Sequence, residues 1–223
     1  MTRRANNKRM TMRMNAPAKR LLVSIPQITS WREGLAFVNS HRDWIERCLA
    51  ALPDNAPFLE GASIMFRGRP TILIRKDGRG APRFLDGQSP ILEIASSPKR
   101  FEAGTRLALK AFAQSEALAY CDQLTPRLGK APTSIALRDT RSRWGSCTAR
   151  GDIMLSWRLI CAPPKVFEYV VAHELAHLLE LNHSPRFWAH VAILMPDWKS
   201  ARMWLKAHGA QLHALGRATP VLA

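Results

Sequence analysis

The segment His173-Glu174-Leu175-Ala176-His177 has residue types and a spacing that suit metal-assisted hydrolysis. On a helix, side chains four positions apart lie on one face about one turn apart, so the imidazoles of His173 and His177 can reach the same ion. Glu174 lies roughly 100° further round the helix, where its carboxylate can reach a water molecule held by that ion. The pattern predicts a metal-dependent hydrolase with Glu174 as the general base.

The residues around this motif favour a buried helix. Apolar side chains surround most of its circumference, at Val166, Val170, Val171, Leu175, Leu178 and Leu179. Three polar side chains at the centre of such a helix need partners, because an unpaired buried polar group is costly. A metal ion would supply that partner, so we expect a metal site rather than hydrogen-bonded core histidines.

A catalytic zinc usually takes three protein ligands and leaves one position for water. His183 is the third candidate. Asn182 can end a helix in the left-handed conformation, and Ser184-Pro185 is typical of the first residues of a new helix. The sequence therefore predicts that His183 lies in a tight turn, where the chain doubles back toward the metal.

Two acidic residues compete with His183 for this place. Glu180 lies three residues past His177 on the same helix. It would approach the ion from the side that the two histidines already occupy, which is a poor position for a third ligand. Asp197 follows Pro196 and is expected to cap the last helix, which gives it a structural role. The other histidines, at 41, 190, 208 and 213, have no partners at metal-binding spacing.

These residues must be positioned by a mixed set of helices and strands. The hydrophobic patterns predict strands at 20–25, 62–67, 70–75, 91–95, 133–138 and 152–157, a loop at 76–90, and helices at 31–52, at 99–124 and from Pro163 onward in three pieces. The predicted organisation is a basic segment at 1–19, a β-rich region with one helix at 20–98, a hydrolase core at 99–213 and a tail at 214–223.

The composition is that of an ordinary globular protein, with 47% hydrophobic and 22% charged residues among 223. No apolar run approaches the roughly 18 residues of a membrane span, so we expect a cytoplasmic protein without a membrane partner. The four cysteines form no CxxC pair and are expected to be free thiols. A net charge of +16 is compatible with nucleic-acid association, and equally with solvated surface charge, because the basic residues are spread along the chain.

Three segments together resemble the YgjP-like metal-dependent hydrolases, relatives of the SprT-like metalloproteases. They are HELAHLLELNHSPRFW (173–188), RDTRSRWGSC (138–147) and DIMLSWRL (152–159), and the resemblance spans about residues 20 to 207. It implies an α+β fold, with a small zincin-type core of mixed sheet plus HExxH helix and an N-terminal β-rich extension. It also implies one zinc ion per chain on His173, His177 and His183, with Glu174 as the base.

The same resemblance implies a peptide substrate bound along an edge strand above the metal helix, here Ile153 to Trp157. The cleft would be lined by Arg141, Arg143, Trp144 and Ser156. SprT-like proteases have a longer stretch between the second and third ligands, so the resemblance does not fix the substrate as a peptide.

Two other functions are compatible with the residues. Some family members are assigned hydrolysis of the pyrophosphate bond in UTP, and phosphate charge would then be neutralised by Arg138, Arg141, Arg143 and Arg158. Alternatively, the chain is a nucleic-acid-binding module without enzymatic activity, with a structural zinc completed by Cys147 or Cys161. Glu174 would have no role in that site.

Overall fold

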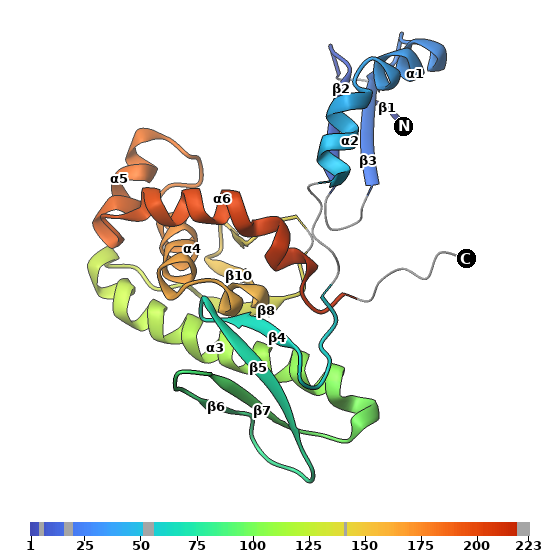
Figure 1. Cartoon of the computed structure of the whole chain (residues 1–223). Helices are drawn as coiled ribbons and strands as arrows, with labels where there is room; N and C mark the ends of the chain where they lie inside the picture. Colours follow the sequence, from blue (N-terminus) through green and yellow to red (C-terminus); the bar gives the residue numbers. More distant parts are fainter. Residues whose placement is uncertain (5–6, 16–19, 51–55, 141, 218–223) are drawn as a thin grey trace. The chain divides into compact units, whose positions relative to one another are not determined.

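The computed structural model describes residues 1–4, 7–15, 20–50, 56–140 and 142–217 (Figure 1). The chain forms two compact units, Met1–Asp54 and Asn55–Ala223. The division falls well before residue 98, where the composition placed it. The reason is that the strands of residues 63–95 share one hydrophobic core with the helices that follow them.

The smaller unit contains a three-stranded sheet and two helices. The sheet has the order β1-β3-β2, with β1 (Thr2–Arg4) parallel and β2 (Thr11–Asn15) antiparallel to β3 (Arg20–Pro26). The helical pattern at 31–52 is divided into α1 (Trp31–Asn39) and α2 (Arg42–Ala50), and its last two residues lie outside the described part. The Ser40 hydroxyl donates to the carbonyl of Phe37, an alternative to continued helix that is typical of serine.

A four-stranded sheet begins the larger unit. Its order is β4-β5-β7-β6, formed by β4 (Ser63–Phe66), β5 (Arg69–Lys76), β6 (Arg83–Leu85) and β7 (Ile91–Ala95). The expected loop at 76–90 therefore contains the short strand β6, which is too brief to show an alternating pattern. Alternate side chains of the longer strands, among them Ile64, Leu73 and Leu92, are buried.

The long helix α3 (Phe101–Leu128) joins this sheet to the rest of the unit. It follows a short 3-10 turn, η2 (Pro98–Arg100), and contacts β7, α4, the 3-10 helix η3 (Trp157–Cys161) and β8. In Figure 1, β6 and β7 lie below α3, β5 crosses α3 in the view, and α4 and the second sheet lie above it. One hydrophobic cluster runs through both layers, and all of its buried members lie between Phe58 and Leu215.

The second sheet has the order β8-β10-β9, with β8 (Ser134–Arg138) parallel and β9 (Gly145–Cys147) antiparallel to β10 (Asp152–Ser156). The expectation that residues 153–157 form the edge strand is wrong. That strand is central and pairs on both sides, so its backbone groups are already bonded. Its neighbour β9 is the edge strand that contacts helix α4.

Three helices complete the larger unit: α4 (Pro164–Ala176), α5 (Pro185–Leu194) and α6 (Trp198–Ala214). None of the helices within the described residues is long and apolar enough to cross a membrane. Asp197 takes the N-cap position of α6, as expected, but its side chain makes no capping hydrogen bond with the helix backbone. Its carboxylate instead accepts a hydrogen bond of 2.9 Å from the Ser200 hydroxyl.

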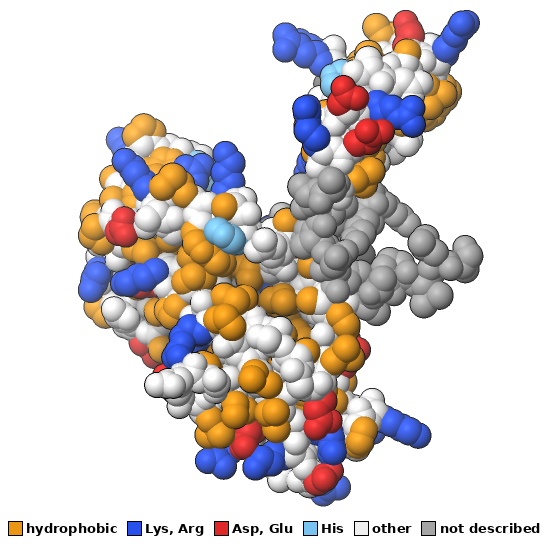
Figure 2. All heavy atoms as spheres, in the orientation of Figure 1, with side chains coloured by type: hydrophobic (Ala, Val, Ile, Leu, Met, Phe, Trp, Pro, Cys, Tyr) orange, Lys and Arg blue, Asp and Glu red, His pale blue; other side chains and the backbone are white. Residues whose placement is uncertain are grey.

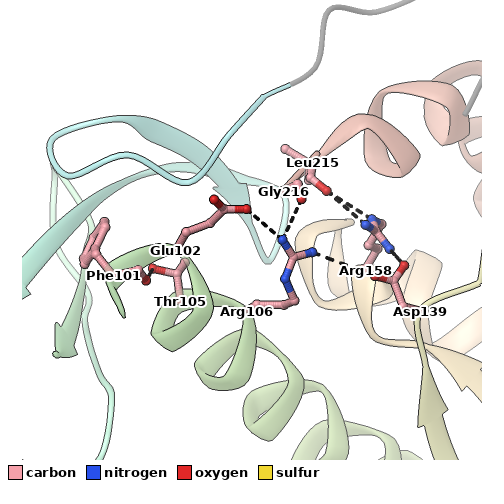
Figure 3. A network of polar contacts seen from close by, with 8 residues as sticks. All are labelled: Phe101, Glu102, Thr105, Arg106, Asp139, Arg158, Leu215 and Gly216. Atoms are coloured by element: carbon pink, nitrogen blue, oxygen red, sulfur yellow. Dashed lines mark hydrogen bonds and ion pairs between the residues drawn. The ribbon is translucent and has the colours of Figure 1, made fainter. Parts of the chain in front are cut away.

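The buried Arg158 and the half-buried Arg106 fix the end of α6 to the core (Figure 3). Arg158 is 1% exposed, pairs with Asp139, and donates twice to the carbonyl of Leu215, at 3.2 and 3.1 Å. Arg106 donates to the carbonyl of Gly216 at 2.8 Å. This network holds the residues after α6 against α3 and η3.

Candidate metal centre

Three histidine side chains converge at one point of the larger unit. His173, His177 and His183 each offer a ring nitrogen, and these three atoms lie within 4.8 Å of one another. The Nε2 atoms of His173 and His183 are 3.1 Å apart. Two nitrogens bound to one tetrahedral zinc would be about 3.3 Å apart, given Zn–N distances of about 2.0–2.1 Å. The donor set and its spacing therefore fit a metal ion.

The local sequence explains how the third histidine reaches the other two. Helix α4 ends at Ala176, His177 caps it, and the next residues form a tightened turn. Asn182 is not left-handed, because Arg67 is the one described non-glycine residue with positive φ. The Asn182 side chain instead accepts from the backbone N–H of Ser184, which in turn caps α5 by accepting from Phe187. These hydrogen bonds define the turn that carries His183.

The two histidines of α4 have surroundings that suit neutral ligands. His177 Nδ1 lies 2.9 Å from the carbonyl of Glu180, a contact that directs Nε2 toward the centre. Burial lowers the pKa of His177, and it lowers the pKa of His173 to about 3, with further contributions from the other two histidines and Arg202. A metal ligand must be unprotonated, so this environment favours metal binding.

Glu174 stands beside this group and is not one of its three members. Its side chain is 5% exposed, and its Oε2 has no hydrogen-bond partner within the described residues. Burial raises the pKa of Glu174 to about 8, against an opposing effect of Arg143. A buried carboxylate oxygen without a partner costs free energy, and such costs are common where the group has a chemical role.

Gly145 of β9 provides the space for Glu174. A Cβ at position 145 would lie 2.5 Å from Oε1 of Glu174 and 2.6 Å from its Cγ. Any side chain here would displace the carboxylate. The glycine of the WGSC segment thus has a physical role that only the folded contact reveals, because 29 residues separate it from Glu174.

A cavity of about 200 Å³ opens next to Glu174 and His173. Trp144 forms one wall, and its indole stacks on the ring of His213 with the centroids 4.0 Å apart. Gly209 permits this arrangement, because a Cβ there would be 3.1 Å from the indole. His213 is thus a stacking partner of Trp144 and not a member of the three-histidine group. The cavity is lined by Trp144, Gly145, Tyr169, Val170, His173, Glu174 and Leu205.

The other residues expected in the cleft are placed differently. Arg143 is exposed and close enough to Glu174 to influence its pKa, whereas Arg141 lies outside the described residues. Ser156 is completely buried, and its hydroxyl has no hydrogen-bond partner within the described part of the chain. It is not among the residues that line the cavity.

The described residues supply no fourth protein ligand. Cys147 and Cys161 are free thiols and do not belong to the three-histidine group. Glu180 and Asp197 are absent from that group too. A set of three histidines without a fourth side chain is typical of a catalytic site rather than a closed structural one.

Comparison with known proteins identifies the family of this chain. The family described as YgjP-like, metallopeptidase domain, matches residues 8–208. No curated protein matches the chain. A solved structure, the metallopeptidase zymogen of Pyrococcus abyssi abylysin, is similar at 20% identity over 41% of this chain and 93% of that one, with a TM-score of 0.38. The family match covers most of the sequence, so the chain belongs to the YgjP-like metallopeptidase family.

Proposed function

We propose that this chain is a zinc-dependent peptidase in which Glu174 acts as the general base. His173, His177 and His183 would hold the ion through their imidazole nitrogens. When bound, zinc supplies a positive charge that polarises a carbonyl group and makes water more acidic. One observation carries the proposal: the buried Glu174 packs against Gly145 of the edge strand β9 and lines the same cavity as His173, a member of the three-histidine group.

The free edge of β9 suits an extended peptide. Ser156 donates to the carbonyl of Trp144 at 2.8 Å, and Thr148 donates to that of Asp152 at 3.0 Å. Bonded and non-bonded pairs alternate along an antiparallel ladder, so the backbone groups of Gly145 and Cys147 point away from β10. A substrate strand that paired with these groups would lie beside Gly145, the residue against which Glu174 packs.

The alternative, hydrolysis of the pyrophosphate bond in UTP, has less support. It relied on four arginines, and Arg158 is buried and bonded to Asp139 and Leu215. Arg138 and Arg143 remain exposed. Among the described members of that set, two exposed cations do not form a phosphate cradle, whereas the strand edge has a direct use in peptide binding; Arg141 lies outside the described residues.

Parallel assays with the zinc-loaded protein test the proposal. We expect slow cleavage of an unfolded polypeptide, inhibition by a chelator, and no pyrophosphate release from UTP. Glu174→Gln should keep one zinc per chain and lose activity by roughly a hundredfold or more, because it preserves size but removes the base. Wild-type turnover by this variant would refute the role of Glu174, and release of pyrophosphate alone would favour the alternative.

The proposal also concerns the location of the protein and its association with nucleic acid. All four cysteines are free, which suits the reducing cytoplasm. Figure 2 shows the Lys and Arg side chains of the larger unit spread over the visible face. Nucleic-acid association therefore stays a prediction from the net charge of +16.

A further inference from the structure

Arg202 lies on a platform of two tryptophans. The rings of Trp188 (α5) and Trp198 (α6) stack with their centroids 4.4 Å apart and 19° between their planes. The guanidinium carbon of Arg202 is 4.9 Å from the Trp188 ring centre and 5.9 Å from that of Trp198. Arginine on an aromatic face is held in place while its in-plane N–H donors stay available.

This platform adjoins the metal centre. Trp188 stacks on His183, and its ring centre is 5.9 Å from those of both His183 and His173. Arg202 is also one turn before Leu205, which lines the cavity beside Glu174.

The charge of Arg202 is not balanced by the protein. Some arginines of the larger unit have carboxylate partners, such as Arg67 with Glu116 and Arg75 with Glu60. For Arg202, the described residues include no carboxylate within ion-pair distance. Arg202 is exposed, so its guanidinium is accessible to an anionic group of a bound substrate.

We propose that Arg202 binds a carboxylate of the substrate, so that the enzyme prefers peptides with a negative charge on the α5–α6 side of the scissile bond. The inference rests on the proposed peptidase function and specifies its substrate class. The carboxylate belongs either to an acidic side chain or to the C-terminus of the peptide. Guanidinium and carboxylate groups form two parallel charge-assisted hydrogen bonds, which makes arginine suited to this task.

Binding measurements can test Arg202 without turnover. The zinc-loaded Glu174→Gln protein would be titrated with three fluorescent peptides that differ in one group: an internal Glu with an amidated end, Gln at that place with an amidated end, and Gln with a free C-terminus. We expect one of the charged peptides to bind about tenfold more tightly than the neutral one. Which one it is identifies the source of the carboxylate.

The same titration in variants assigns the preference to Arg202. Arg202→Met retains an apolar stem on the tryptophans and should abolish the discrimination, whereas Arg202→Lys should keep part of it. Lys206→Met, at an exposed position one turn later on α6, is the matched control and should keep it fully. Zinc content and melting temperature confirm that each variant is folded.

The outcomes separate this inference from the proposed function. Equal binding of all three peptides, or an unchanged preference in Arg202→Met, would overturn the role of Arg202, even if the wild-type enzyme cleaves polypeptides. Conversely, if the zinc-loaded wild-type protein cleaves none of them, the peptidase proposal fails. The binding preference would still decide whether Arg202 recognises a carboxylate.

Discussion

At the scale of single residues, the position of Glu174 depends on a neighbour without a side chain. A Cβ on Gly145 would overlap the carboxylate, and none of the three histidines is among the atoms that it would meet most closely. We therefore expect Gly145→Ala to lower kcat at least tenfold, because misplacing a catalytic group by about 1 Å is costly. Zinc affinity should stay close to that of the wild type.

Gly87→Ala is the control for the Gly145 prediction, because a Cβ at position 87 would meet nothing within 4 Å. Cleavage of a fluorogenic peptide and a competition titration with a chromogenic chelator measure the two properties separately. Full activity in Gly145→Ala would show that Glu174 can move without consequence. Loss of zinc would show that the change disturbs the metal ligands as well.

The third ligand gives a second test at this scale. His183→Ala should lower zinc affinity by a large factor, because it removes one of three convergent nitrogens. Asp197→Ala removes only a surface contact with Ser200, and it should leave zinc affinity unchanged. The same chelator titration compares the two variants. Normal zinc binding by His183→Ala, together with its loss in Asp197→Ala, would assign the site to another class of zincins.

The sequence predicted the residues of the site that lie close together along the chain. The HExxH motif depends only on the geometry of one helix, so its spacing can be read from the sequence. The Asn182–Pro185 segment likewise predicted the turn that carries His183. Gly145 and Leu205 could not be found in this way. Their roles come from contacts between β9, α4 and α6, and nothing in their own neighbourhoods reveals those contacts.

At the scale of elements, strand pairing was the feature that sequence reasoning missed. Residues 145–147 are too few to show alternation, so β9 was not expected, and β10 was assigned the edge in its place. The longer elements, in contrast, were predicted from the sequence. Hydrophobic patterning over many residues predicted α3, β5, β7 and the three helices after Pro163, because these elements contribute apolar side chains to the core at regular spacing or, in α4, nearly all round the helix.

His213 of α6, which stacks on Trp144 in the loop before β9, predicts a dependence of stability on pH. Burial first, and then Arg158 and Arg217, lower the pKa of His213 from 6.5 to about 4. Between these values the unfolded chain binds a proton that the folded one does not. The free energy of unfolding should therefore fall as the pH is lowered from about 6.5 to 4, with His213 contributing about 2–3 kcal/mol.

Urea unfolding at a series of pH values measures this contribution. His213→Gln should flatten the pH dependence relative to the wild type, and the comparison cancels the effects of the other histidines. The exposed His41, substituted in the same way, is the matched control. Identical slopes for wild type and His213→Gln would mean that the folded protein accommodates a protonated His213.

At the scale of the whole molecule, the chain divides into parts of unequal stability. The large hydrophobic cluster lies entirely within the unit Asn55–Ala223, which also contains all three candidate ligands. The smaller unit, Met1–Asp54, has few fully buried apolar side chains within its described residues, among them Val23 and Ile25. A small core supports little stability. We therefore expect the smaller unit to unfold at a lower temperature than the larger one.

Zinc should stabilise the larger unit selectively. A ligand that binds only the folded state adds RT ln(1 + [L]/Kd), about 4 kcal/mol at a thousandfold excess over Kd. Scanning calorimetry with and without zinc should show two transitions, of which only the upper one moves. In His183→Ala, which lacks one ligand, the shift should largely disappear. If zinc moved both transitions of the wild type together, the two units would unfold cooperatively, and the stability of the first 54 residues would depend on the metal centre.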